Sequence, residues 1–260
     1  MLQVRNLSVR FGGLLALDNA SFEVREGEVL SLIGPNGAGK TTAFNAVSGY
    51  LAPSGGEILF RGNSLGGLNP SRIAALGLVR TFQKTSLFGN RSALDNVLTG
   101  LHLKATQTPL AIMLGLPYVA REEKALADEA LAILKFVGLQ DRRGEVANSL
   151  AYGEQRLLEV AIALAARPKL LLLDEPVSGM NPSETVGFMA KLGEIRALGV
   201  TVLLVEHDMK MVMGVSDRVV CLSQGRIIAE GTPADIQRNP EVVKAYLGAR
   251  FAEKYAGARA

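Results

Sequence analysis

A glycine-rich segment near the N-terminus has the composition of a phosphate-binding loop. The segment GPNGAGKTT (Gly34–Thr42) follows an apolar run typical of a strand and precedes TAFNAVSGYL, which has helical character. It fits the pattern G-x-x-x-x-G-K-[ST], in which glycines let backbone N–H groups turn inward around an anion. The N-terminus of the following helix adds about half a positive charge. Because loop, lysine, hydroxyl and flanking elements all agree, phosphate binding is favoured over a glycine-rich turn without a ligand.

The polar side chains of this loop suit different parts of a phosphate chain. Lys40 can reach the outer phosphates as a point charge, and Thr42 is placed for an inner phosphate. The Thr41 hydroxyl can ligate Mg²⁺, which prefers oxygen ligands. The predicted ligand-binding residues of the loop are Gly34, Pro35, Asn36, Gly37, Ala38, Gly39, Lys40, Thr41 and Thr42.

An acidic pair follows a buried strand farther along the chain. In KLLLLDEP (Lys169–Pro176), four leucines predict the strand, and Asp174 and Glu175 stand at its carboxyl end. Asp174 can hold Mg²⁺ through water, and Glu175 can orient or deprotonate an attacking water. An isolated acidic pair at a strand end is commonly only solvated. In a chain with a phosphate loop, we favour the catalytic interpretation.

Two further segments end in polar groups that suit the same chemistry. LLVEHD ends a buried strand with His207, whose neutral imidazole can bond a phosphate oxygen or the attacking water. VRTFQK places Gln83 after a strand-like segment, where its amide can accept water protons or bind Mg²⁺; alone, such a glutamine is usually a surface residue. The carboxyl ends of parallel strands share one crevice, so His207 is expected there. His102 lies in a helical stretch without a partner motif and is expected to be structural or on the surface.

The segment NSLAYGEQRLLEVAIALAA predicts a helix with a glycine at an unfavourable position. Asn148 and Ser149 are good N-cap residues, and apolar residues recur behind them at helical spacing. Gly153 stands where a helix would prefer another residue, since glycine costs about 1 kcal/mol relative to alanine. We therefore expect that bare backbone is needed at Gly153.

The elements that must position these groups indicate an α/β protein with a mainly parallel sheet. The N-terminal region alternates between apolar and polar residues, as strands do, and SGGEILFRG resembles a further strand between glycines. From Asn90 to Ala166 the pattern is mostly helical, and the later runs PKLLLLDEP and GVTVLLVEHD are typical of buried parallel strands. The tail after Gly231 suggests short helices.

Composition excludes several classes of protein. The 260 residues are 48% hydrophobic, so a sizeable core is available. The net charge is +3 without a long basic run, and tryptophan is absent, so no nucleic-acid partner is expected. The one cysteine, Cys221, is expected in a buried strand and suits a reducing compartment. The N-terminus lacks the apolar core of a signal peptide, and no apolar stretch approaches the ~20 residues of a membrane span.

Five motifs, taken in order, resemble those of the nucleotide-binding subunit of ATP-binding-cassette (ABC) transporters: GPNGAGKTT, TFQ, LAYGEQR, LLLLDEP and EHD. The resemblance implies a P-loop NTPase with a recombinase-like α/β core and an antiparallel β subdomain (1–84 and 167–231). It also implies an inserted helical subdomain (85–166) and a C-terminal helical tail (232–260). The implied cofactors are ATP and Mg²⁺, with Thr41, Gln83 and Asp174 at the metal.

The resemblance also implies roles for particular residues. Phe11 matches the aromatic residue that stacks on adenine, although ordinary core packing is an alternative. Gln83 matches the residue that links the nucleotide site to the membrane partner, and His207 matches the switch histidine. The implied catalytic residues are Lys40, Gln83, Glu175 and His207. The signature loop, which faces the γ-phosphate bound by another copy, would comprise Leu150, Ala151, Tyr152, Gly153 and Glu154.

Two departures from the family pattern resemble one subfamily. The first is in the signature loop, where Ala151 replaces the usual serine and Tyr152 the following glycine. The second is Asn181, which stands where many relatives carry aspartate. Loss of the serine removes a bond to a charged group, worth on the order of 1.5–3 kcal/mol. These departures resemble the ATPases of branched-chain amino acid importers, in particular the longer of their two ATPase subunits.

The resemblance implies a second ABC ATPase subunit and transmembrane permease subunits as partners, at the cytoplasmic face of the membrane. Three alternatives stay open from the sequence. They are an importer of urea, amides or another small solute, an exporter of lipid or polysaccharide, and a soluble ABC protein acting on DNA or ribosomes.

Overall fold

The computed structural model of the protein describes residues 1–81, 87–102, 113 and 117–246. Within these residues the strands form two sheets. The antiparallel sheet has the order β2-β1-β4-β5, and it comprises β1 (Leu2–Phe11), β2 (Leu14–Val24), β4 (Gly55–Phe60) and β5 (Asn63–Ser64).

The second sheet carries the strands whose ends hold the predicted site. Its order is β10-β9-β3-β8-β7-β6, and all neighbouring pairs are parallel except β9 with β10. Its strands are β3 (Val29–Ile33), β6 (Leu78–Arg80), β7 (Leu170–Asp174), β8 (Thr201–Val205), β9 (Arg218–Ser223) and β10 (Arg226–Gly231). The prediction of an α/β fold with a mainly parallel sheet is confirmed.

Helices cover both faces of the parallel sheet, which explains the continuous apolar runs of its strands. Leu170 and Leu172 pack into a core shared with α1 (Lys40–Val47) and the antiparallel sheet. The alternate residues Leu171 and Leu173 pack on the other face, against α7 (Pro182–Ala197) and α8 (Met209–Val215). Two short helices, α2 (Pro70–Ala75) and α9 (Pro233–Arg238), complete this part of the molecule, and residues 240–246 are also helical.

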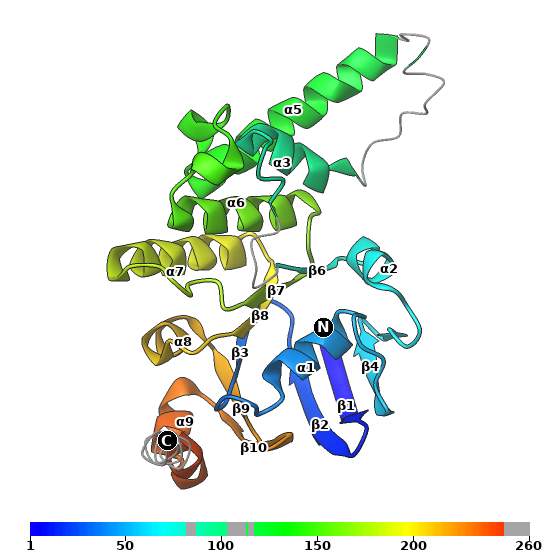
Figure 1. Cartoon of the computed structure of the whole chain (residues 1–260), viewed down its shortest axis with the longest axis vertical. Helices are drawn as coiled ribbons and strands as arrows, with labels where there is room; N and C mark the ends of the chain where they lie inside the picture. The colour runs from blue at the N-terminus through cyan, green and yellow to red at the C-terminus, as the bar shows by residue number, and fades with distance from the viewer. Residues whose placement is uncertain (82–86, 103–112, 114–116, 247–260) are drawn as a thin grey trace, which may run out of the picture.

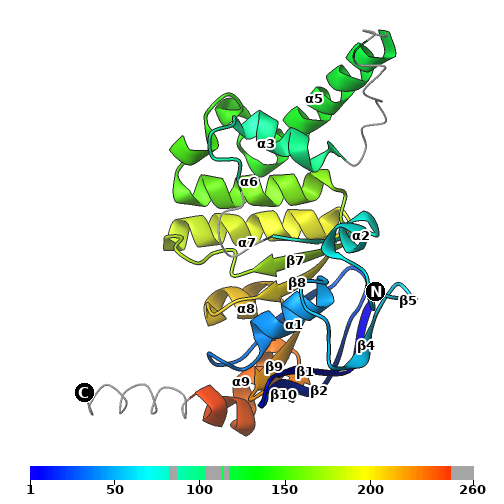
Figure 2. The same ribbon diagram turned by 45° about the vertical axis from the view of Figure 1, so that its right-hand side comes forward.

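The segment between β6 and β7 forms a mainly helical layer with its own core (Figures 1 and 2). It contains α3 (Ala93–Gly100), α5 (Pro117–Val137) and α6 (Tyr152–Ala165), with short 3₁₀ turns at Gln140–Arg142 and Ala147–Ser149. Apolar residues from the three helices pack together, among them the fully buried Val97, Leu134 and Leu158. Both views show α6 beside α7, so this layer stands on the helices of the parallel sheet.

The predicted start of α6 was wrong. Asn148 and Ser149 lie in the preceding 3₁₀ turn, and the helix begins at Tyr152. The carboxylate of Glu154 accepts a hydrogen bond from the backbone N–H of Ala151 over 3.0 Å. A side chain inside the first turn therefore caps this helix, so the cap residues expected from propensity are not used.

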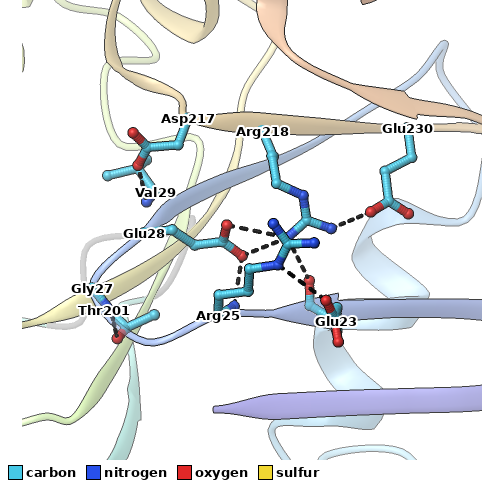
Figure 3. Close-up of polar contacts among 9 residues, drawn as sticks. All are labelled: Glu23, Arg25, Gly27, Glu28, Val29, Thr201, Asp217, Arg218 and Glu230. Atoms are coloured by element: carbon cyan, nitrogen blue, oxygen red, sulfur yellow. Dashed lines mark hydrogen bonds and ion pairs between the residues drawn. The ribbon is translucent and has the colours of Figure 1, made fainter.

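A polar cluster ties the strands together at the end of the sheet opposite the predicted site (Figure 3). Glu28 is 7% exposed, and its carboxylate accepts hydrogen bonds from Nη1 of Arg218 over 2.8 and 3.1 Å. Arg218 also pairs with Glu230 on β10. Beside it, Asp217 accepts a hydrogen bond from the N–H of Val29 over 2.9 Å. These bonds fix the turn before β3 against β9.

Candidate nucleotide-binding site

The phosphate loop connects the carboxyl end of β3 to the N-terminus of α1, and glycine is required at two of its positions. Gly34 has φ +150°, and a Cβ there would lie 2.1 Å from the carbonyl oxygen of Leu222. Gly39 has φ +106°, and a Cβ there would lie 2.7 Å from the carbonyl oxygen of Ala16. The loop is therefore pressed against its neighbours, and only glycine fits without displacement.

Lys40, the first residue of α1, is held inside the loop. Its Nζ donates hydrogen bonds to the carbonyl oxygens of Gly34 over 2.6 Å and Pro35 over 3.1 Å. Burial is the largest influence on its pKa and lowers it, while the negative charges of Glu175 and Asp174 act in the opposite direction. The ammonium is thus placed where the loop amides would surround an anion.

A cavity of about 570 Å³ brings most of the predicted groups together. Phe11, the loop residues 36–42, Glu175 and His207 all line it. Phe11 is 49% exposed, so ordinary core packing does not explain this residue. A ring beside a phosphate loop offers an adenine a stacking surface.

Glu175 and His207 both line this cavity, and their side chains are in direct contact. Nε2 of His207 lies 2.5 Å from Oε1 of Glu175. Glu175 has φ +50°, and its N–H donates to the carbonyl oxygen of Val205 over 2.8 Å. The backbone therefore turns sharply at the end of β7 and directs this carboxylate toward the end of β8.

Glu206 is a positioning residue that the sequence motifs did not single out. It is 3% exposed, and its two oxygens accept hydrogen bonds from the N–H groups of Val177 over 3.0 Å and His207 over 2.8 Å. It thereby joins the loop after Glu175 to the loop that carries His207. The signal in the sequence was a carboxylate at the end of an apolar strand, next to a histidine.

The predicted metal ligands have the right chemistry for Mg²⁺. Thr41 lines the cavity, and Asp174, which is 2% exposed, ends the adjacent strand β7. Among the described residues, no group of three or more His, Cys, Asp or Glu residues could hold a metal without help. Mg²⁺ is commonly bound by one or two protein oxygens together with phosphates and water, so this small oxygen set fits. Gln83 lies outside the described residues.

The signature-loop residues Leu150 to Glu154 do not line this cavity, because they surround the start of α6 in the helical layer. A Cβ at Gly153 would meet the end of the flexible Glu184 side chain of α7 at 3.0 Å, so Gly153 is packed against α7 and a side chain there would displace that glutamate by a few tenths of an ångström. The hydroxyl of Tyr152 accepts a hydrogen bond from Arg156 over 2.7 Å. The ring of Tyr152 lies against Gly179: a Cβ added at Gly179 would stand 2.9 Å from a carbon of that ring.

Asn181 is the N-cap residue of α7. Its side-chain oxygen caps α7 by accepting hydrogen bonds from the N–H groups of Ser183 over 2.9 Å and Glu184 over 3.0 Å. Two residues predicted to lie away from the site have the expected burial: His102 is exposed, and Cys221 is fully buried in β9.

The chain belongs to the ABC transporter family, whose ATP-binding cassettes are transport-coupled ATP hydrolases. The family model described as "ABC transporter" matches residues 17–178, more than half of the chain. A second model, "Branched-chain amino acid ATP-binding cassette transporter", matches residues 226–252. The resemblance drawn from the five motifs is thereby confirmed.

Individual proteins indicate the kind of ABC transporter ATPase to which the chain is similar. The chain is 45% identical over 249 residues to the high-affinity branched-chain amino acid transport ATP-binding protein LivG of Salmonella typhimurium, covering 95% of this chain and 98% of LivG. It is equally similar, at 45% over 249 residues, to BraF of Pseudomonas aeruginosa, which carries the same description. Its fold matches the ADP conformation of MJ1267, an ATP-binding cassette of an ABC transporter, with a TM-score of 0.83 and 31% identity over 95% of this chain and 98% of that one.

None of the helices in the described ranges has both the length and the apolar character needed to cross a membrane.

Proposed function

We propose that this chain is the ATP-binding and hydrolysing subunit that powers import of branched-chain amino acids. The observation that carries the proposal is one cavity lined by the phosphate loop, Phe11, Glu175 and His207. The solute is inferred from relatives such as LivG and BraF, which are named for branched-chain amino acid transport.

In this proposal each side chain of the cavity acts on a bound ATP. Lys40 and the loop N–H groups bind the outer phosphates, and Phe11 stacks on adenine. Glu175 accepts a proton from the attacking water. His207 forms hydrogen bonds with Glu175 and with the terminal phosphate, and so fixes their relative positions. Bound Mg²⁺ would neutralise phosphate charge, with Thr41 and Asp174, together with the predicted Gln83, as its protein partners.

The proposal requires a second ATPase subunit, because the signature loop lies outside its own chain's cavity. Ala151 is exposed and Tyr152 is 42% exposed, whereas Leu150 and Gly153 are buried, so residues 151 and 152 are the part of this loop that another molecule can reach. The N–H groups and dipole at this helix end favour an anion such as a γ-phosphate. A switch from mostly open to mostly closed needs about 5.5 kcal/mol of differential affinity, and the two bridged γ-phosphates are the source that this proposal names.

The remaining partners are transmembrane permease subunits. The chain would bind them peripherally at the cytoplasmic face of the membrane, with the region of Gln83 at the contact. We also propose the division stated above, in which 85–166 is a helical subdomain, 1–84 and 167–231 form the catalytic core, and 232–260 is a C-terminal tail.

The test is reconstitution with the permease and the second ATPase subunit in liposomes. We expect ATP-dependent uptake of leucine, isoleucine and valine, and loss of that uptake in Glu175→Gln. Uptake of urea or amides instead would leave the ATPase assignment intact and replace the solute. Strong retention on nucleic acid at moderate salt, without transport, would favour a soluble ABC protein.

A further inference from the structure

Arg80, the last residue of β6, forms a buried ion pair with Asp174. Its Nη2 lies 2.7 Å from Oδ2 of Asp174, and the two side chains are 8% and 2% exposed. The strands β6 and β7 are parallel neighbours in which Arg80 stands opposite Leu172. The arginine side chain therefore extends along β7 to the carboxylate at its end.

The other half of the guanidinium is anchored to the end of α1. Nη1 donates hydrogen bonds to Oδ1 of Asn45 over 2.8 Å and to Oγ of Ser48 over 2.9 Å. The ring of Phe44 lies 5.5 Å from the guanidinium carbon, a cation–π distance. Arg80 thus connects the helix that begins at the phosphate loop with the strand that ends at Asp174.

This geometry depends on the shape of arginine as well as on its charge. A planar guanidinium can bond a carboxylate on one side and two neutral oxygens on another in fixed directions, whereas lysine is a flexible point charge. A buried carboxylate needs such a partner, because an unpaired charge away from water is costly. Among the described residues, Arg80 is the cation that the structure pairs with Asp174.

We propose that Arg80 is a positioning residue for the magnesium-binding carboxylate: it fixes the orientation of Asp174 relative to the phosphate loop and so sets the affinity for Mg²⁺ in the nucleotide complex. The inference rests on the proposed role of Asp174 as a magnesium partner.

The test separates magnesium affinity from nucleotide affinity. Binding of a fluorescent ATP analogue is measured in EDTA and then during titration with Mg²⁺, for the wild type, Arg80→Gln and Arg80→Lys. We expect unchanged affinity in EDTA and a rise in the Mg²⁺ midpoint of about 10- to 100-fold for Arg80→Gln, the usual effect of losing an outer-shell partner. The Mg²⁺ midpoint of Arg80→Lys should lie between those of the wild type and Arg80→Gln, since lysine keeps the positive charge but lacks the planar set of donors.

Arg72→Gln is the matched control, because Arg72 is an exposed arginine on α2. Its Mg²⁺ midpoint should equal that of the wild type. If Arg80→Gln also equals the wild type, or if its affinity in EDTA falls as much as its affinity in Mg²⁺, the inference is wrong.

A double-mutant cycle covers the case in which Arg80→Gln folds poorly. Asp174→Asn should raise the Mg²⁺ midpoint, and adding Arg80→Gln to it should raise the midpoint no further, because the two residues act as a unit. Additive effects would overturn the inference. Failure of the wild type to bind nucleotide would contradict the proposed function itself, so the two failures are distinguishable.

Discussion

Nε2 of His207 lies 2.5 Å from Oε1 of Glu175, although the two residues are 32 positions apart in the chain. The contact follows from the sheet, because β7 and β8 are parallel neighbours in which Asp174 stands opposite Val205. Glu175 directly follows Asp174, and His207 lies two residues beyond Val205, so both stand at this end of the sheet and line the same cavity as the phosphate loop. A proton acceptor and the group that holds it are thus placed by backbone pairing.

The first prediction concerns Glu175→Gln. The amide keeps the size of the side chain and can still contact His207, but it is too weak a base to accept a proton from water. We expect ATP binding to be retained and hydrolysis to fall by about 10²–10⁴-fold, the usual contribution of a general base. Equilibrium binding and steady-state phosphate release measure the two effects, and normal turnover would refute the role given to Glu175.

Glu206 should matter through the backbone that it holds. Glu206→Ala leaves the N–H groups of Val177 and His207 without their acceptor, at about 1–3 kcal/mol for each buried donor. Urea unfolding should show this loss, and hydrolysis should fall more than ATP binding because His207 is displaced. Glu26→Ala, at an exposed glutamate, is the control, and equal stability of the two variants would contradict the prediction.

The cluster around Glu28 should stabilise the fold without affecting the site. Arg218→Met leaves Glu28 buried without its cation and should cost about 3–5 kcal/mol of unfolding free energy. Adding Glu28→Leu removes the stranded charge and should recover most of that loss. Nucleotide affinity of the folded protein should stay unchanged, because Glu28 directly precedes β3 (Val29–Ile33) whereas the phosphate loop follows that strand. A measurable change in the nucleotide affinity of the folded Arg218→Met variant would contradict this prediction.

Gly34→Ala should damage the phosphate loop directly. The new Cβ would stand 2.1 Å from the carbonyl oxygen of Leu222, so the backbone must shift. Overpacking of this kind typically costs about 1–3 kcal/mol, and here the shift also misplaces the loop amides. We expect weaker ATP binding by titration. Gly144→Ala, which has nothing within 4 Å of the added Cβ, should bind ATP normally.

Cys221 gives a prediction in alkaline solution. Burial raises the pKa of its thiol from an ordinary 9.0 to about 11, while the charge of Lys40 opposes the shift. Because the folded-state pKa lies above the unfolded value, the contribution of Cys221 to stability is fully present below about pH 9 and is lost as pH rises toward 11. The stability difference between the wild type and Cys221→Ala should therefore shrink across this interval. A constant difference from pH 8 to pH 11 would exclude the shift.

Much of the site could be predicted because its signals are local. The spacing of Gly34, Gly39 and Lys40 defines a phosphate loop within a few residues, and the apolar run before Asp174 defines a buried strand. Periodicity likewise indicated a helical region after Asn90. The start of α6 could not be predicted in this way, since Glu154 caps the helix from inside its first turn and the better cap residues lie in a 3₁₀ turn.

The sequence by itself determined which chemistry the chain carries, because glycine spacing, a lysine and strand-end carboxylates act through short stretches of backbone. Only the tertiary structure decided which of these groups meet. Parallel pairing of β7 with β8 brings Glu175 to His207, and pairing of β6 with β7 brings Arg80 to Asp174. Such partners come from strands far apart in the chain, so no local pattern could identify them before the sheet order was known.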